Sequence, residues 1–151
     1  MKILTRSIDL ANQDYLRSEI VYLILASSSP EHVQDEATQR ETWASKLPEG
    51  NAALWLRGSG ETPPHVSQQT LWVSCADSEI LRKTILGLRW LLSNSDFSYL
   101  VRTNVSTYFH VPEFSDQIRE LGHHDFIEIG RAHVRTPVTS GYLVCRLLLE
   151  K

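Results

Sequence analysis

A run of three serines is the first segment of the sequence that can bind an anionic ligand. Ser27, Ser28 and Ser29 follow a continuous apolar run at residues 20–26 and come directly before Pro30. Proline is favoured in the first turn of a helix, and a preceding serine caps it. Backbone N–H groups at such a turn can bind a phosphate. A plain capping turn and a phosphate site are therefore both open interpretations of this segment.

The second polar segment is residues 102–106 (Arg-Thr-Asn-Val-Ser), directly after an apolar run at residues 97–101. Strand alternation would place Arg102, Asn104 and Ser106 on one side. These side chains form hydrogen bonds, and the segment has no carboxylate, the ligand that hard divalent cations prefer. A polar strand end followed by a turn is the alternative to a ligand-facing surface.

Arg40 is a third candidate binding residue. A helix from Pro30 through about residue 44 would place its guanidinium on the same stripe as Val33, Ala37 and Ala44. A guanidinium on a core-facing stripe needs an internal carboxylate or a ligand phosphate as its partner, unless the side chain extends to the surface.

The sequence predicts no metal site. None of the six histidines has H-x-x-x-H spacing or a cysteine partner. Cys75 and Cys145 are far apart and form no C-x-x-C pair, so we interpret them as buried thiols in a reducing compartment. The sequence also has no Walker loop, G-x-G-x-x-G or G-x-S-x-G motif.

Strands and helices must alternate along the chain to position these residues. The apolar runs predict strands at residues 20–26, 52–56, 71–73, 97–101 and 126–129. Helices are predicted at residues 30–44, from Asp77 as a cap to about residue 92, and at residues 112–121 and 141–149. The apolar face of the second helix is Leu81, Ile85, Leu88 and Leu92, and residues 61–69 are expected to form an exposed loop. This order is typical of an α/β domain with a Rossmann-like, mostly parallel sheet and helices on both faces. Ligands bind at the carboxyl ends of strands in such sheets.

Length and charge limit the other possibilities. The 151 residues fit an N-terminal arm at residues 1–18 and one soluble domain at residues 19–151. The net charge of −3 argues against nonspecific nucleic-acid binding. No apolar run reaches the roughly 20 residues of a membrane span, and the first ten residues do not form a signal peptide. We therefore expect a cytoplasmic protein.

The order of several segments resembles the beta-3-galactosyltransferase and Fringe-like glycosyltransferases, whose fold is GT-A. That family has an apolar strand, a serine-rich turn and then an Arg-x-Thr-Trp motif, which residues 24–30 and 40–43 match. Residues 54–58 match its strand ending in glycine, and Asp77 with Lys83-Thr84 matches a further segment. Residues 96–103 and 139–144 complete the resemblance, which covers residues 20–150.

The resemblance implies a hexosyltransferase that moves a sugar from a nucleotide-sugar donor, of the UDP type, to an unknown glycan or protein acceptor. By position, Asp96 and Glu128 are the candidates for the general base. The donor-binding candidates are Ser27, Ser28, Ser29, Arg40, Lys83, Arg102, Asn104 and Ser106.

Two departures from the family pattern bear on function. Where the family has an acidic triplet that holds Mn²⁺, this chain has Asn104, Val105 and Ser106. A requirement for Mn²⁺ is therefore left open, and Arg102 or Arg40 would supply positive charge in its place. The chain also stops at Lys151, before the acceptor-side region of the family. The alternatives are thus a truncated domain, a chain completed by a partner subunit, or a noncatalytic module that binds a nucleotide or a protein.

Overall fold

The computed structural model describes residues 17–121 and 148–150, which form an α/β fold. In chain order the elements are β1 (Arg17–Leu25), α1 (Pro30–Glu41), the 3-10 turn η2 (Ala44–Lys46), β2 (Asn51–Gly58), β3 (His65–Ser67), β4 (Thr70–Val73), α2 (Ile80–Asn94), β5 (Asp96–Asn104), α3 (Val111–Leu121) and β6 (Leu148–Glu150).

The strands form one mostly parallel sheet in the order β3-β4-β2-β1-β5-β6. Strands β4, β2, β1 and β5 are parallel, whereas β3 and β6 run antiparallel to β4 and β5. The central strand β1 has β2 on one side and β5 on the other, so Leu25 pairs with Leu56 and with Asn104. The strand order therefore reverses beside β1, which is where ligands bind in open α/β sheets.

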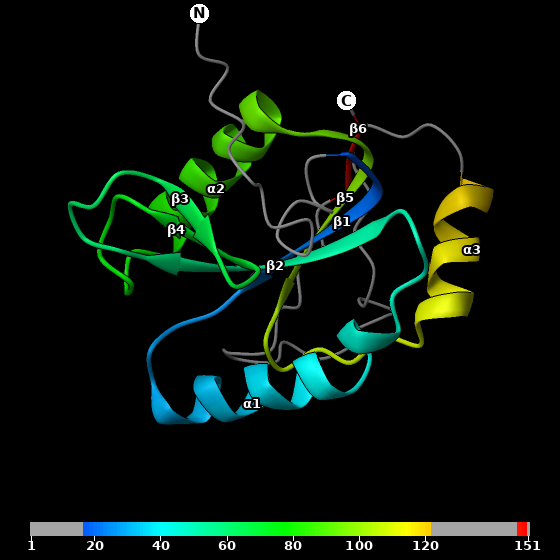
Figure 1. The fold of residues 1–151 in the computed structure, drawn as a ribbon, viewed down its shortest axis with the longest axis horizontal. Coiled ribbons are helices and arrows are strands. Elements are labelled where there is room, and N and C mark those ends of the chain that lie inside the picture. The colour runs from blue at the N-terminus through cyan, green and yellow to red at the C-terminus, as the bar shows by residue number, and fades with distance from the viewer. Residues whose placement is uncertain (1–16, 122–147, 151) are drawn as a thin grey trace, which may run out of the picture.

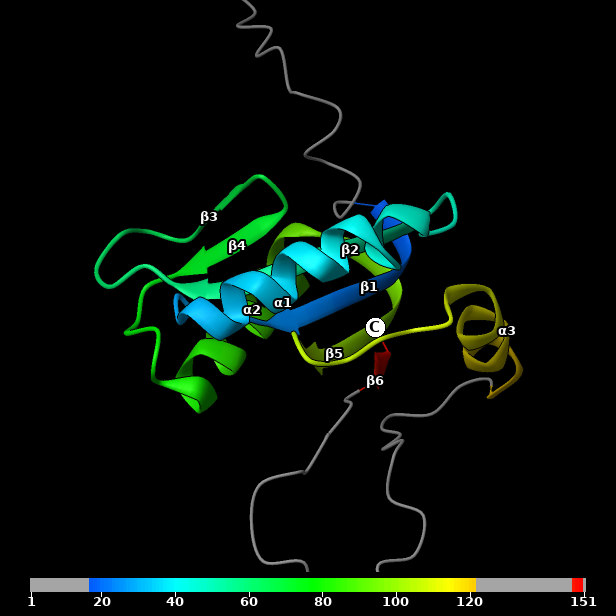
Figure 2. The same ribbon diagram turned by 90° about the horizontal axis from the view of Figure 1, so that it is seen from below.

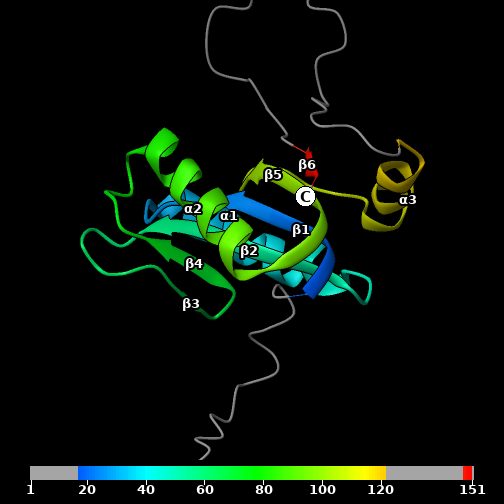
Figure 3. The ribbon, with the colours of Figure 1, turned by 90° about the horizontal axis from the view of Figure 1, so that it is seen from above.

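Helices cover both faces of the sheet, as the sequence predicts. Figure 1 shows α1 below the strands and α2 above them, and Figures 2 and 3 show each helix in front of the sheet from its own side. Residues Tyr22 and Ile24 of β1 belong to the core on the α1 side, and Val21 and Leu23 belong to the core on the α2 side. Burial on both faces explains the continuous apolar run in this strand.

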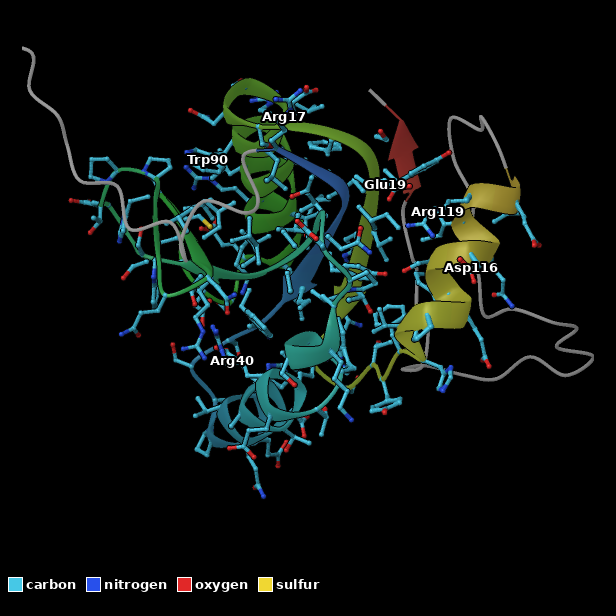
Figure 4. All side chains as sticks on the ribbon, turned by 45° about the vertical axis from the view of Figure 1, so that its right-hand side comes forward. Arg17, Glu19, Arg40, Trp90, Asp116 and Arg119 are labelled. Atoms are coloured by element: carbon cyan, nitrogen blue, oxygen red, sulfur yellow. The ribbon has the colours of Figure 1, made fainter. Side chains whose placement is uncertain are left out.

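Helix α3 packs on the α1 side of the sheet. Phe114 and Ile118 join the core there, and Phe114 lies next to Tyr22 and Phe109. Arg119 anchors the far end of the helix, because its Nε and Nη2 atoms each donate a hydrogen bond of 2.8 Å to the Glu19 carboxylate. The two side chains face each other in Figure 4.

The predicted inner face of the first helix is wrong within α1, although Ala44, which follows α1 in η2, packs against the core as expected. Val33 is 46% exposed and Ala37 is exposed, whereas Glu36 and Gln39 are buried. Gln39 joins the helix to the sheet and to the loop after β5, since its Oε1 accepts from Trp55 Nε1 at 3.1 Å and its Nε2 donates to the Thr107 carbonyl at 2.8 Å. Satisfied hydrogen bonds allow polar side chains to face the core.

The predicted apolar face of α2 is also wrong as a core-facing surface, except at Leu88, which packs against the core. Leu81 is 74% exposed, and Ile85 and Leu92 are exposed as well. The helix instead turns Lys83 and Gly87 toward the sheet. A Cβ atom on Gly87 would lie 2.8 Å from the methyl groups of Leu56, so the close approach of helix and strand requires the glycine side of the helix.

Several boundaries also differ from the sequence expectation. Strand β3 lies within the predicted loop at residues 61–69, and β5 continues to Asn104. Helix α2 begins at Ile80 with Glu79 in the cap position, so Asp77 does not cap it. Strand β6 replaces the end of the helix predicted at residues 141–149; the rest of that helix, the strand at 126–129 and nearly all of the N-terminal arm lie outside the described residues. None of the helices in residues 17–121 is long and apolar enough to cross a membrane.

Candidate functional site

A cavity of about 410 Å³ lies where β1 and β5 end, beside the reversal of strand order. Its walls come from four segments: the end of β1 with the residues after it, the first turn of α1, the start of α2 with the residues leading into it, and the end of β5 with the turn that follows. The lining residues are Leu25, Ala26, Ser27, His32, Asp77, Ser78, Ile80, Lys83, Asn104, Val105 and Ser106. Apolar walls with a few convergent polar groups are typical of small-molecule sites.

Lys83 lines this cavity, and all of its hydrogen-bond donors are used within the protein. Its side chain is 1% exposed, and Nζ donates to the carbonyl oxygens of Ala26 and Asp77 at 2.7 Å and to Asp77 Oδ1 at 2.9 Å. These bonds use all three ammonium hydrogens. The predicted donor-binding residue Lys83 thus lines the cavity, but it has no hydrogen left for a ligand.

Asp77 completes this cluster, which we call the Asp77–Lys83 clamp. Its carboxylate also accepts the N–H groups of Gly58 at 2.9 Å and Ser28 at 2.7 Å. Burial alone would raise the pKa of the Asp77 carboxyl, but the hydrogen bonds from Gly58, Lys83 and Ser28 outweigh it and hold that pKa below its ordinary value. The clamp therefore joins the ends of β1 and β2 to the start of α2.

The serine turn has a mainly structural part and a ligand-facing part. The Ser28 N–H is donated to Asp77, the Ser29 N–H approaches Ser27 Oγ at 3.3 Å, and Ser29 caps α1 by accepting the His32 N–H at 3.4 Å. The backbone groups of Ser28 and Ser29 are thus used within the protein, as the capping interpretation expects. Of the three serines, Ser27 is the one that lines the cavity.

His32 lies beside Ser27 and was not identified from the sequence. Its Nδ1 atom is 2.6 Å from Ser27 Oγ, and both residues line the cavity. Within residues 17–121, no hydrogen bond to the other ring nitrogen, Nε2, is formed. The one sequence feature that could have identified it is its position three residues after the capping residue Ser29, near the carboxyl end of β1.

The predicted residues at the end of β5 separate into two groups. Asn104 and Ser106 line the cavity, and Asn104 Oδ1 is buried without a hydrogen-bond partner in the described part of the chain. Arg102 lies two residues earlier, paired with Leu23 in the middle of the sheet, and does not line the cavity. The segment thus contributes an amide and a hydroxyl to the cavity, and no cation.

Arg40 lies at a different place, on the α1 side of β2 and β4 (Figure 4). Its guanidinium stacks 3.7 Å above the Trp55 ring and binds the Glu36 carboxylate, the Thr70 hydroxyl and the Gln69 amide. Glu36 also accepts from Arg57 at 2.6 Å. Arg40 therefore has an internal carboxylate as its partner, one of the two partners that the sequence left open.

The two candidate bases are not found at the cavity. Asp96 is the first residue of β5 and Asn104 is the last, so at about 3.3 Å per residue they are separated by about 26 Å. Asp96 is thus at the wrong end of the strand to act as a base at this cavity, and Glu128 lies outside the described residues.

His32 is the ionisable side chain of the lining that remains available to a ligand, because Asp77 and Lys83 are paired with each other. Residues 17–121 and 148–150 contain no group of three histidine, cysteine, aspartate or glutamate side chains that could hold a metal ion.

No protein-family model matches this sequence, and no curated protein matches it.

Proposed function

We propose that this domain binds a nucleotide-sugar donor, such as a UDP-sugar, in the cavity and forms the donor-binding part of a glycosyltransferase with an unknown acceptor. One observation carries the proposal: the cavity brings Ser27 together with Asn104 and Ser106. The resemblance assigns these three residues to the donor, although they come from opposite ends of the described region. A GT-A arrangement of the α/β fold is part of the same proposal.

The chemistry of the lining suits such a ligand. Leu25, Ile80 and Val105 offer apolar surface for a base or for the face of a sugar ring. The Ser27 and Ser106 hydroxyls and the Asn104 amide are suitable partners for ribose or sugar hydroxyl groups. The cavity volume lies within the range of roughly 300–1,000 Å³ that is usual for small-ligand sites.

The proposal does not depend on a divalent metal. Asp77 is the one carboxylate of the lining, and both of its oxygens accept hydrogen bonds from the protein. The described lining thus offers a hard cation no free carboxylate. We expect donor binding to be insensitive to Mn²⁺.

A noncatalytic nucleotide-binding module is the second candidate. The observation that favours it is the place of the carboxylates: Asp77 is held by the clamp, and Asp96 lies at the far end of β5. The residues described as lining the cavity therefore provide no free carboxylate that could deprotonate an acceptor hydroxyl. Slow hydrolysis of a bound donor would favour the enzyme, and binding without turnover would favour the module.

Isothermal titration of the chain with UDP and UDP-sugars, with and without Mn²⁺, tests the proposal. We expect micromolar affinity that falls about tenfold in Ser27→Ala and in Asn104→Ala, because each loses a hydrogen bond to the ligand. Ser98→Ala is the matched control, since this hydroxyl is exposed on β5 away from the cavity. If no nucleotide binds under either condition, the donor site does not exist.

A further inference from the structure

We propose that His32 is the phosphate-binding residue of the cavity, with its Nε2–H donating to a phosphate oxygen of the ligand while Ser27 holds Nδ1. The identity of the ligand as a nucleotide rests on the proposed function above. The geometry of His32 and its neighbours supports the phosphate contact itself.

The first step is that the ring of His32 is held in place. The 2.6 Å contact between Nδ1 and Ser27 Oγ fixes the ring from one side, and the His32 backbone N–H is donated to Ser29 Oγ. A hydrogen bond at one imidazole nitrogen determines what the other nitrogen can do. Because Nε2 has no partner among the described residues, it is the atom that a ligand in the cavity can use.

The second step is that the other cationic side chain of the lining is already occupied. Lys83 donates all three of its hydrogens, two of them to Asp77. The N–H groups of Ser28 and Ser29 are donated within the serine turn and to the clamp. Arg40 and Arg102 do not line the cavity. Of the described lining residues, His32 is therefore the side chain that can bring a positive charge to a phosphate, beside the neutral donors Ser27, Asn104 and Ser106.

The third step concerns the proton on Nε2. The Ser27 hydroxyl can donate to Nδ1, which leaves the hydrogen of a neutral ring on Nε2. When the ring is protonated, both nitrogens donate, and the Ser27 hydroxyl can accept from Nδ1 and donate to Ser29 Oγ, which is 3.1 Å away. A phosphate accepts hydrogen bonds in either case, and the charged form of the pair is the stronger one.

The competing arrangement is a neutral ring with its hydrogen on Nδ1. Nε2 would then be an acceptor and would suit a ribose hydroxyl in place of a phosphate. The two arrangements differ in what they predict for uridine, which has the ribose and no phosphate. The experiment therefore compares pyrophosphate, UDP and uridine.

The imidazole nitrogens of the full chain are followed by ¹⁵N NMR during titration with each of these three compounds. The His32 signals are assigned by their loss in His32→Gln. We expect pyrophosphate and UDP to shift the Nε2 resonance to saturation. UDP should bind His32→Gln about 10- to 100-fold more weakly, because a hydrogen bond to a charged group is lost, and uridine should be unaffected. His65→Gln is the matched control, since His65 is exposed on β3 and does not line the cavity.

Each result decides between the two proposals. UDP binding that leaves Nε2 unmoved, or uridine shifting Nε2 as strongly as UDP, overturns the role of His32 and leaves the donor site in place. A shift with pyrophosphate without affinity for any nucleotide supports His32 and overturns the proposed function. No binding of any of the three overturns both. If His32→Gln fails to fold, the loss of signals in His32→Asn supplies the same assignment, and the titration of the unaltered chain is then read in the same way.

Discussion

Helices α1 and α2 cover opposite faces of the same sheet, and both turn polar residues inward. Helix α1 is joined to β2 through Glu36 and Gln39, whose partners are side chains and the carbonyls of Asn104 and Thr107, and to β4 through Arg40. Helix α2 is joined to the ends of β1 and β2 through Lys83, whose partners are backbone carbonyls and Asp77. The difference is one of position: Asp77 and Lys83 line the cavity, whereas Glu36 does not, and Gln39 reaches the cavity only through its hydrogen bond of 3.2 Å to the Asn104 carbonyl. A mutation of Glu36 should therefore alter stability alone, and one of the clamp should alter stability and ligand binding together.

The largest expected effect is that of Lys83→Met. Removal of the ammonium leaves the partly buried Asp77 carboxylate without its counter-ion, and we expect a loss of about 3 kcal/mol in the free energy of unfolding. The urea midpoint measures this loss. Lys46→Met is the control, because Lys46 is exposed in η2. A loss no larger than that of the control would mean that the clamp does not stabilise the fold.

Glu36→Gln should have a smaller effect, on the other side of the sheet. The amide cannot neutralise Arg40 and Arg57, whose guanidinium groups both bind the Glu36 carboxylate. We expect a loss of about 1–2 kcal/mol, since both guanidinium groups are partly exposed and also stack on tryptophan rings. Glu41→Gln at the exposed end of α1 is the control. Nucleotide affinity should stay unchanged, and a large change in it would refute the division between the two sides.

The smallest effect is expected in acid. Because the folded protein holds the pKa of Asp77 below its ordinary value, this group stabilises the fold above the unfolded pKa, and the contribution is lost as the pH falls through the folded pKa. Asp77→Asn should be less stable at neutral pH and should lose less stability than the unaltered chain between about pH 5 and pH 3. Urea midpoints across this range measure the difference. Parallel curves for the two proteins would show that Asp77 does not contribute to acid sensitivity.

The four parallel strands were predictable from the sequence, whereas β3, β6 and the inner faces of α1 and α2 were not. Residues 20–26 reveal a strand because burial on both faces makes every position apolar. The inner faces of the helices depend on long-range contacts. Gly87 faces inward because Leu56 approaches it, and Gln39 faces inward because Trp55 and Thr107 supply hydrogen-bond partners. No local pattern contains these partners.

The candidate site was predictable where position at a strand end was sufficient. Asn104 is the last residue of β5, and Ser27 and Ser106 each come two residues after the end of a strand. All three line the cavity. Arg40 was expected among the donor-binding residues but does not line the cavity. Its partners Thr70 and Gln69 come from a different part of the chain, which the local sequence does not reveal. His32 was missed because a single histidine without a spacing pattern gives no signal until the helix cap places it beside Ser27.

The burial of Lys83 has a consequence for its chemical reactivity. An amine that is 1% exposed and donates three hydrogen bonds has no accessible lone pair, so acylating reagents and acetyltransferases cannot modify it in the closed structure. Modification requires that α2 first separate from the ends of β1 and β2. The rate of Lys83 acylation, relative to that of the exposed Lys46, therefore reports how often this part of the fold opens.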